Sequence, residues 1–169
     1  MILLASVASG PALLAGCAST TTGGDSPTRA ETPQASSSGT HPTQLLLAAD
    51  SSLTDSDANG FPDTFQVVTY LFPESDVSAL PVWAEGTFEF TLTGPDGKPI
   101  ERWVFDQEAS RAARVRTSVG RAESFFLRFG EGRDRMAPTV AELRGRFVSQ
   151  DGRVLTAAGA TSVRVGARR

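Results

Sequence analysis

The aromatic residues of this chain are confined to one stretch of the sequence. All ten Phe, both Trp and the single Tyr lie between Phe61 and Phe147. Large aromatic side chains supply much of the apolar area that a core buries, so the part of the chain that can fold begins near Gln44 and ends near Val165. A stretch of about 120 residues is long enough for one domain with its own core. The sequence therefore predicts a single folded domain within residues 44–169.

The segment before this domain has a very different composition. Of the 26 residues from 18 to 43, 18 are Ser, Thr, Pro or Gly, and none is aromatic, Leu, Ile or Val. Such a segment cannot bury enough apolar area to offset the entropy that is lost on ordering. We therefore expect residues 17–43 to be a disordered tether whose ends lie roughly 25–30 Å apart. The only histidine, His41, falls in this tether and is a poor candidate for a catalytic base or metal ligand.

The first 17 residues form a distinct motif. An apolar stretch over residues 2–14 runs into Ala15-Gly16-Cys17, and Cys17 is the only cysteine of the chain. The stretch is shorter than the roughly 20 apolar residues that span a bilayer. An ordinary secretory signal, which also ends in small residues, and a short buried helix are the alternatives. The position of the lone cysteine favours a lipidation signal over both.

Leu14-Ala15-Gly16-Cys17 resembles the lipobox of bacterial lipoprotein signal peptides. The resemblance implies that residues 1–16 are a signal peptide cleaved just before Cys17, and that the Cys17 sulfur carries diacylglycerol. It also implies, usually, a third acyl chain (palmitate) on the new amino terminus. Two or three acyl chains meet the two-signal requirement for stable anchoring. We therefore expect an extracytoplasmic protein, lipid-anchored to the cell envelope. Ala18 is not the Asp-type retention signal of Gram-negative lipoproteins, which by the same resemblance favours the outer membrane.

The folded region has the periodicity of short β-strands. Residues 86–92 alternate between apolar and polar side chains, as expected for a strand with one buried face. Residues 94–97 place Pro and Gly where a turn requires them, and residues 101–105 return as the second arm of a hairpin. Further strands are expected at residues 44–48, 66–72, 124–129, 142–148 and 160–165, with a turn at Asp151-Gly152. About seven short strands separated by such turns predict an all-β protein, an immunoglobulin-like or related antiparallel β-sandwich.

One segment departs from the β pattern. Residues 106–116 carry good helix formers without alternation, and acidic residues come first and Arg residues last, as a helix dipole favours. We expect a short helix of roughly one to three turns that crosses between the two sheets. The arrangement over residues 44–166 is similar to small uncharacterised bacterial lipoproteins in which an acidic loop enters a β-sandwich.

The most specific chemical motif is Asp55-Ser-Asp-Ala-Asn-Gly-Phe-Pro-Asp63. Its oxygen-bearing side chains and its Gly match the first nine positions of an EF-hand-type calcium loop, and it resembles the aspartate-rich loops of thrombospondin type 3 repeats and dockerins. It is a single copy with Gln66 in place of the final acid, which predicts calcium affinity in the roughly 0.1–1 mM range. The alternative is a solvated acidic turn at Asn59-Gly60. The candidate calcium ligands are the side chains of Asp55, Asp57, Asn59 and Asp63 and the carbonyl oxygen of Phe61.

Charge is distributed unevenly along the chain, whose net charge is −3. Residues 50–108 carry 12 acids against one Lys and one Arg, and residues 109–169 carry 13 Arg against five acids. If the two halves interleave in the sandwich, acidic residues 85–89 can pair with basic residues 144–146, at about 0.2–1 kcal/mol for each cross-strand pair. The alternative is a basic face that contacts anionic polymers or phospholipid headgroups. Its candidate members are Arg111, Arg114, Arg116, Arg121, Arg128, Arg133, Arg135, Arg144 and Arg146.

The sequence carries no motif of a familiar catalytic class. No nucleophile elbow, P-loop or zinc-binding HExxH motif occurs, and no nucleic-acid-binding motif is present. Paired carboxylates could cleave glycosides, but on one strand Glu85 and Glu89 would lie about 13 Å apart, which is too far. We therefore expect a protein that is not an enzyme and does not bind nucleic acid, with calcium as the one candidate cofactor.

Two functions fit these features. The first is a membrane-anchored β-sandwich that binds or scaffolds another envelope protein or polysaccharide, which predicts an exposed apolar or charged patch on one sheet. The second is a calcium-dependent adhesion or carbohydrate-binding module, which predicts Trp83 or Trp103 exposed beside the acidic loop. Core packing is the alternative role for both tryptophans. An enzyme would instead show a concave site with convergent carboxylates.

Overall fold

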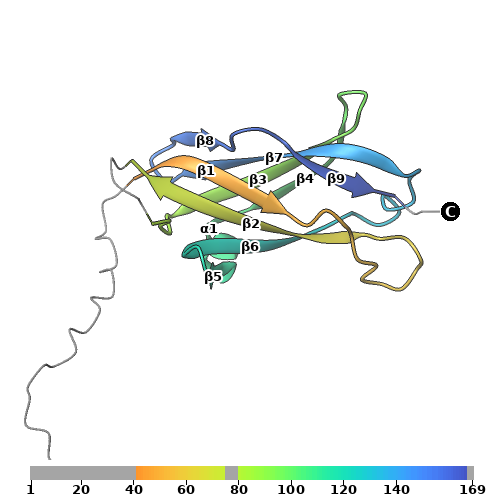
Figure 1. The fold of residues 1–169 in the computed structure, drawn as a ribbon, viewed down its shortest axis with the longest axis horizontal. Helices are drawn as coiled ribbons and strands as arrows, with labels where there is room; N and C mark the ends of the chain where they lie inside the picture. Colours follow the sequence, from red (N-terminus) through yellow and green to blue (C-terminus); the bar gives the residue numbers. More distant parts are fainter. Residues whose placement is uncertain (1–40, 75–79, 167–169) are drawn as a thin grey trace, which may run out of the picture. The chain divides into compact units, whose positions relative to one another are not determined.

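The computed structural model describes residues 41–74 and 80–166, which form two antiparallel β-sheets and one short helix (Figure 1). Sheet A has the strand order β1-β2-β6-β5, and sheet B has the order β4-β3-β7-β8, with β9 also paired to β7. The all-β sandwich is therefore confirmed. The elements are β1 (Pro42–Ala49), β2 (Thr64–Pro73), β3 (Gly86–Thr93), β4 (Pro99–Phe105), α1 (Gln107–Ala112), β5 (Arg114–Arg116), β6 (Arg121–Arg128), β7 (Thr139–Ser149), β8 (Val154–Thr156) and β9 (Thr161–Val165).

The predicted signal peptide, Cys17 and the tether up to residue 40 lie outside the described residues. The folded region begins slightly before the predicted boundary at residue 44, because β1 starts at Pro42, which is buried and pairs with Pro73. The composition of Pro42 and Thr43 matches the tether, but proline is tolerated at the first residue of an edge strand, as here in β1. Among the described residues, the one helix has six residues and does not have the length to cross a membrane.

All seven predicted strands are present, and the short helix crosses from β4 of sheet B to β5 of sheet A. The helix is shorter than predicted. Asp106 caps it by accepting a hydrogen bond from the Ala109 N–H (2.9 Å), and it ends at Ala112. Residues 114–116 form β5 instead, because a turn closed by the Thr117 N–H and the Gly120 carbonyl (2.8 Å) folds them back onto β6. Gly120 has a φ of +139°, a conformation that favours glycine.

Strand β8, like β5, is absent from the prediction. The eleven-residue β7 pairs with β8 through its C-terminal half and with β9 through its N-terminal half. The predicted turn at Asp151-Gly152 connects β7 to β8, with Gly152 at a φ of +83°. Because β8 has only three residues, it is too short to show a period in the sequence.

A group of phenylalanines joins the two sheets. Phe125 of β6 lies 5.1 Å from Phe88 and 4.6 Å from Phe105 between ring centroids, and both partners belong to sheet B. Phe88 is fully buried and also contacts Phe147 at 4.8 Å. A second group places Trp103 at 5.8–5.9 Å from two Phe rings, so the core-packing role of this tryptophan is confirmed.

The two ends of the sandwich carry different features (Figure 1). Strand β1 begins at one end, together with the end of β2, helix α1, β5 and the start of β6. We call this the Pro42 end. The acidic β1–β2 connection (residues 50–63) and the loop after β6 (residues 129–138) lie at the opposite end, which we call the Asp63 end.

Candidate functional site

The outer face of sheet A is almost free of charge. Its alternate residues point either into the core or outward, and the strand registers bring the outward positions of the four strands together. Arg128 is the one charged residue among the outward positions of these strands, and it lies at the Asp63 end. The remaining outward residues include Gln44, Leu46, Ala48, Gln66, Val68, Tyr70, Phe72, Val115, Ser124 and Phe126.

This outer face presents large apolar side chains to solvent. Phe126 is 66% exposed and Leu46 is 50% exposed. The Gln66 amide donates to the Ser124 hydroxyl (2.7 Å), so these polar groups of the face are paired with each other. Polar groups that are already paired need not lose a water partner when a surface is covered. The face can therefore be buried at low electrostatic cost.

The outer face of sheet B has the opposite character. Glu89 of β3 pairs directly with Arg146 of β7, whose guanidinium lies 2.7 Å from the carboxylate, and it also pairs with Arg102 of β4. The predicted interleaving of acidic and basic strands is thereby confirmed. Burial opposes ionisation of Glu89, yet the hydrogen bonds from both arginines outweigh it and lower the pKa of this carboxyl. Covering this face would require desolvation of its ion pairs.

The nine arginines of the predicted basic face do not form one surface. Most are divided among separate carboxylates: Arg128 contacts Asp57 and Asp63, Arg133 contacts Glu101, Arg144 contacts Glu142, Arg146 contacts Glu89, and Arg111 and Arg114 share Glu85. Arg135 lies over the ring of Phe61. Arg116 and Arg121 lie on strands β5 and β6, and among the described residues neither forms an ion pair with a carboxylate.

In the acidic loop, the buried Asp63 carboxylate has a structural role. Its side chain is 3% exposed and accepts hydrogen bonds from the Ser56 N–H (2.8 Å), the Ser56 hydroxyl (2.8 Å) and the Arg128 Nε–H (2.9 Å). Burial would raise its pKa, but these hydrogen bonds prevail and the pKa of Asp63 lies below its ordinary value. The carboxylate therefore holds the loop onto β6.

The other predicted calcium ligands are also used within the loop. Asp55 accepts from the Gly60 N–H (2.7 Å), and Asp57 accepts from the Asn59 N–H (3.2 Å). The Asn59 amide donates to Asp57 and to Asp134 (2.9 Å), and its oxygen accepts from the Phe61 N–H (2.8 Å). In residues 41–74 and 80–166, no three His, Cys, Asp or Glu side chains are arranged to hold a metal ion. The hydrogen bonds favour the acidic turn, and calcium binding stays a prediction.

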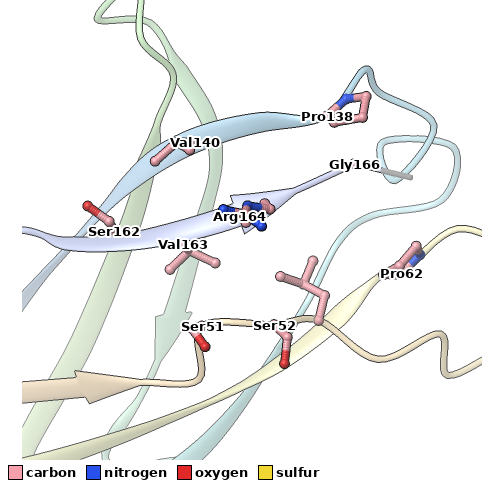
Figure 2. Close-up of a pocket in the computed structure, with 10 residues that line it drawn as sticks. Ser51, Ser52, Pro62, Pro138, Val140, Ser162, Val163, Arg164 and Gly166 are labelled. Carbon is pink, nitrogen blue, oxygen red and sulfur yellow. The ribbon is translucent and has the colours of Figure 1, made fainter. Parts of the chain in front are cut away.

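Two concave regions lie at the Asp63 end. A polar cleft of about 470 Å³ is lined by four acidic side chains, but Arg128 and Asn59 already pair with three of them, namely Asp57, Asp63 and Asp134. A larger groove of about 900 Å³ separates Ser51 and Ser52 from β9 (Figure 2). Its walls are mainly apolar, with Arg164 as the one charged side chain that lines it. Ser51, Ser52, Ser162 and Arg164 are the polar side chains that line this groove.

Neither tryptophan stands exposed beside the acidic loop. Trp83 follows Val82, which forms a bridge with Leu71 near the end of β2, so it lies toward the Pro42 end. Trp103 packs on the core and donates its indole N–H to the Arg128 carbonyl (2.7 Å). The aromatic arrangement expected of the carbohydrate-binding alternative is therefore absent from the described part of the chain.

Comparisons of the chain with protein-family models, curated proteins and solved structures found no significant match.

Sequence reasoning missed one unusual group, Glu123 of β6. It is 1% exposed, it faces the interior, and neither of its carboxyl oxygens has a hydrogen-bond partner. Thr69 lies opposite it in the ladder, but the Thr69 hydroxyl is also unpaired. Burial raises the pKa of Glu123 to about 8, against the opposing charge of Arg114 and with a smaller contribution from Glu85. The sequence signal was a lone Glu in line with Phe125 and Leu127, which face the core from the same strand.

We expect Glu123 to make stability fall as pH rises from about 4.5 to about 8. The folded state keeps the Glu123 proton up to its raised pKa, whereas the unfolded chain loses it near the ordinary value, so the unfolded state binds fewer protons in this window. From pH 5 to pH 7 the free energy of unfolding should fall by about 2–3 kcal/mol. Denaturant unfolding across this range should show a smaller loss for Glu123→Gln. Glu142→Gln, which changes an exposed glutamate, is the control. The prediction is contradicted if the free energy of unfolding falls equally with pH in the wild-type protein, Glu123→Gln and Glu142→Gln.

The two interpretations of the acidic loop differ in a thermal melt. Because its carboxylates already accept backbone and Arg128 donors, we expect about 1 mM calcium to leave the melting temperature unchanged relative to chelator. We also expect Asp63→Ala to lower it equally in both conditions. A rise of several degrees with calcium that an Asp55→Ala/Asp57→Ala variant loses would establish the calcium site, since a ligand that binds only the folded state stabilises it.

Proposed function

We propose that this protein is a lipid-anchored binding module of the bacterial cell envelope, which uses the outer face of sheet A to bind a protein partner. The anchor part rests on the lipobox-like Leu14-Ala15-Gly16-Cys17 and on the composition of the tether. The binding part rests on a single observation: the outer face of sheet A exposes Leu46 and Phe126 with Arg128 as its one charged residue, whereas the outer face of sheet B carries ion pairs beside its exposed valines.

The contrast between the two outer faces favours sheet A as the binding interface. Burial of apolar surface contributes about 25 cal/mol per Å², and the exposed Leu46 and Phe126 offer such surface. Burial of Glu89 with its two arginines would oppose binding unless every charge found a new partner. Because large apolar patches on a soluble domain mark interaction sites, sheet A is the better interface.

A protein surface suits this face better than a polysaccharide does. Sugar hydroxyl groups need hydrogen-bond partners when they are buried, whereas the Ser124 hydroxyl of this face already accepts a hydrogen bond from the Gln66 amide. Aromatic residues such as Phe126 and Tyr70 are enriched in the cores of protein interfaces. The expected partner therefore presents a complementary apolar and uncharged surface.

The anchor has a direct test. Cys17→Ala should move the protein from the membrane fraction to the soluble fraction, and the wild-type mature amino terminus should carry the mass of the acyl chains. Membranes should be washed at about 0.5 M salt, because high salt screens ionic contacts between the folded domain and the bilayer. If Cys17→Ala stays with salt-washed membranes, or if the mature protein carries no lipid, the anchor proposal fails.

The binding face can be tested in cells with a photo-crosslinking amino acid in place of Leu46 or Phe126. Both positions should give a discrete crosslinked product with another protein, because both lie on the proposed interface. Matched controls are Val104 and Val154, which are 57% and 54% exposed on sheet B. Equal crosslinking from both sheets, none from sheet A, or a product that contains only a second copy of this chain would contradict the proposal.

A further inference from the structure

Three arginines surround one tryptophan at the Pro42 end. The guanidinium carbons of Arg114, Arg116 and Arg121 lie 5.6, 5.6 and 5.0 Å from the centroid of the Trp83 ring. Trp83 is held in place because its indole N–H donates to the Ala122 carbonyl (3.1 Å). The electron-rich face of an indole attracts such cations, so the ring organises three positive charges within a small volume.

This arrangement concentrates charge that the described residues do not neutralise. Arg116 and Arg121 are direct partners in the β5–β6 ladder, and like charges at such positions repel each other. Among the described residues neither has a carboxylate partner, and of the three arginines only Arg114 is paired, with Glu85. Cations gathered in this way create a local positive potential that attracts an anionic surface.

The nearest buried acid does not cancel these charges. Glu123 is the direct ladder partner of Arg114, and its raised pKa of about 8 keeps it largely neutral at pH 7. Glu85 is shared by Arg111 and Arg114 and therefore balances only one of those two cations. The chain as a whole is acidic, with a net charge of −3, so any attraction to an anionic surface must come from a local region such as this one.

Two exposed aliphatic side chains lie on the loops beside the arginines. Leu80 is 56% exposed and Val119 is 50% exposed. Their loops touch, since Pro81 approaches Gly120 so closely that a Cβ on Gly120 would lie 2.9 Å from the proline ring. Arg121 directly follows this contact in the chain. Exposed aliphatic residues flanked by cations are the combination that inserts into the headgroup region of a bilayer.

The position of this end favours a bilayer as the occupant. The chain enters the sandwich at Pro42, at the same end as β5 and the start of β6 (Figure 1). In the proposed lipoprotein, the 24 residues 18–41 connect this end to the lipid on Cys17. A tether of that length keeps the Pro42 end within tens of ångströms of the headgroups. The local concentration of anionic lipid at this end would therefore be high.

We propose that the Pro42 end docks on an anionic phospholipid surface, where Arg116 and Arg121 contact headgroup phosphates and Leu80 and Val119 enter the interfacial region. This inference rests on the proposed function for the proximity of a membrane. The docked state places the uncharged face of sheet A in a fixed orientation relative to the bilayer. Lipid composition would thereby influence how the binding face is presented.

Vesicle cosedimentation tests the docking independently of the anchor. The protein used is the chain from Ala18, which lacks both lipid and signal segment and retains every described strand and helix. It should bind phosphatidylglycerol-containing vesicles, bind pure phosphatidylcholine vesicles much more weakly, and lose binding as salt rises. Arg116→Glu/Arg121→Glu should weaken binding at least about tenfold, since each arginine near such a surface contributes about 1 kcal/mol.

Matched variants separate a local site from net charge. Arg144→Glu/Arg164→Glu makes the same change in charge on sheet B and should retain binding. Leu80→Asp/Val119→Asp should weaken binding, whereas Val104→Asp/Val140→Asp should weaken it much less. Arg116→Gln/Arg121→Gln, a milder change, should also weaken binding, and the melting temperature of each variant shows whether it folds.

Several outcomes would overturn the docking proposal. The protein could bind phosphatidylglycerol-containing and phosphatidylcholine vesicles equally, or bind neither. Alternatively, Arg116→Glu/Arg121→Glu and Arg144→Glu/Arg164→Glu could weaken vesicle binding equally. Protection of Arg116 and Arg121 from chemical modification by inorganic phosphate, without vesicle binding, would indicate a small-anion site instead. If the chain from Ala18 does not bind vesicles but the wild-type protein carries an acylated Cys17, only the docking proposal is rejected. If the chain from Ala18 binds vesicles but the wild-type protein carries no lipid on Cys17, only the anchor proposal is rejected.

Discussion

The aromatic contact across the two sheets is the interaction on which the rest of the structure depends. Phe125 is the sheet A residue whose ring meets Phe88 and Phe105 of sheet B, and Phe147 extends the same cluster. Buried aromatic rings of this kind contribute large apolar areas and specific edge contacts. Because the cluster fixes one face of each sheet inward, it also decides which residues remain outside. The properties of the two outer faces follow from that decision.

The two outer faces then differ in what they can do. On sheet B, Glu89 forms ion pairs with Arg102 and Arg146 across three strands, and burial of that face would require their desolvation. On sheet A, exposed apolar residues such as Phe126 lie among polar groups that are already paired. A partner that covers sheet A gains apolar burial and disrupts few hydrogen bonds. The proposed binding function follows from this asymmetry.

The ends of the sandwich have separate roles. At the Asp63 end, the acidic loop is tied to β6 through Asp63 and Arg128, so its carboxylates serve the fold. At the Pro42 end, Trp83 gathers arginines that have fewer carboxylate partners, beside the buried and unpaired Glu123. A domain that docks through its Pro42 end would keep the acidic end away from the bilayer. Like-charge repulsion between that end and anionic lipids would favour the same orientation.

The sandwich class and its main strands could be predicted from the sequence, because alternation in β3 and the turn residues around it act locally. The sequence also predicted the pairing of Glu89 with the basic strand. The strands β5 and β8 were not predictable, since three residues carry no period and their pairing depends on distant partners. The cluster of three arginines around Trp83, the burial of Glu123 and the ion pair of Asp63 with Arg128 depend on how the strands pack together. The contacts of Trp83 and Asp63 join residues 31 to 65 positions apart, and no local pattern encodes such distances.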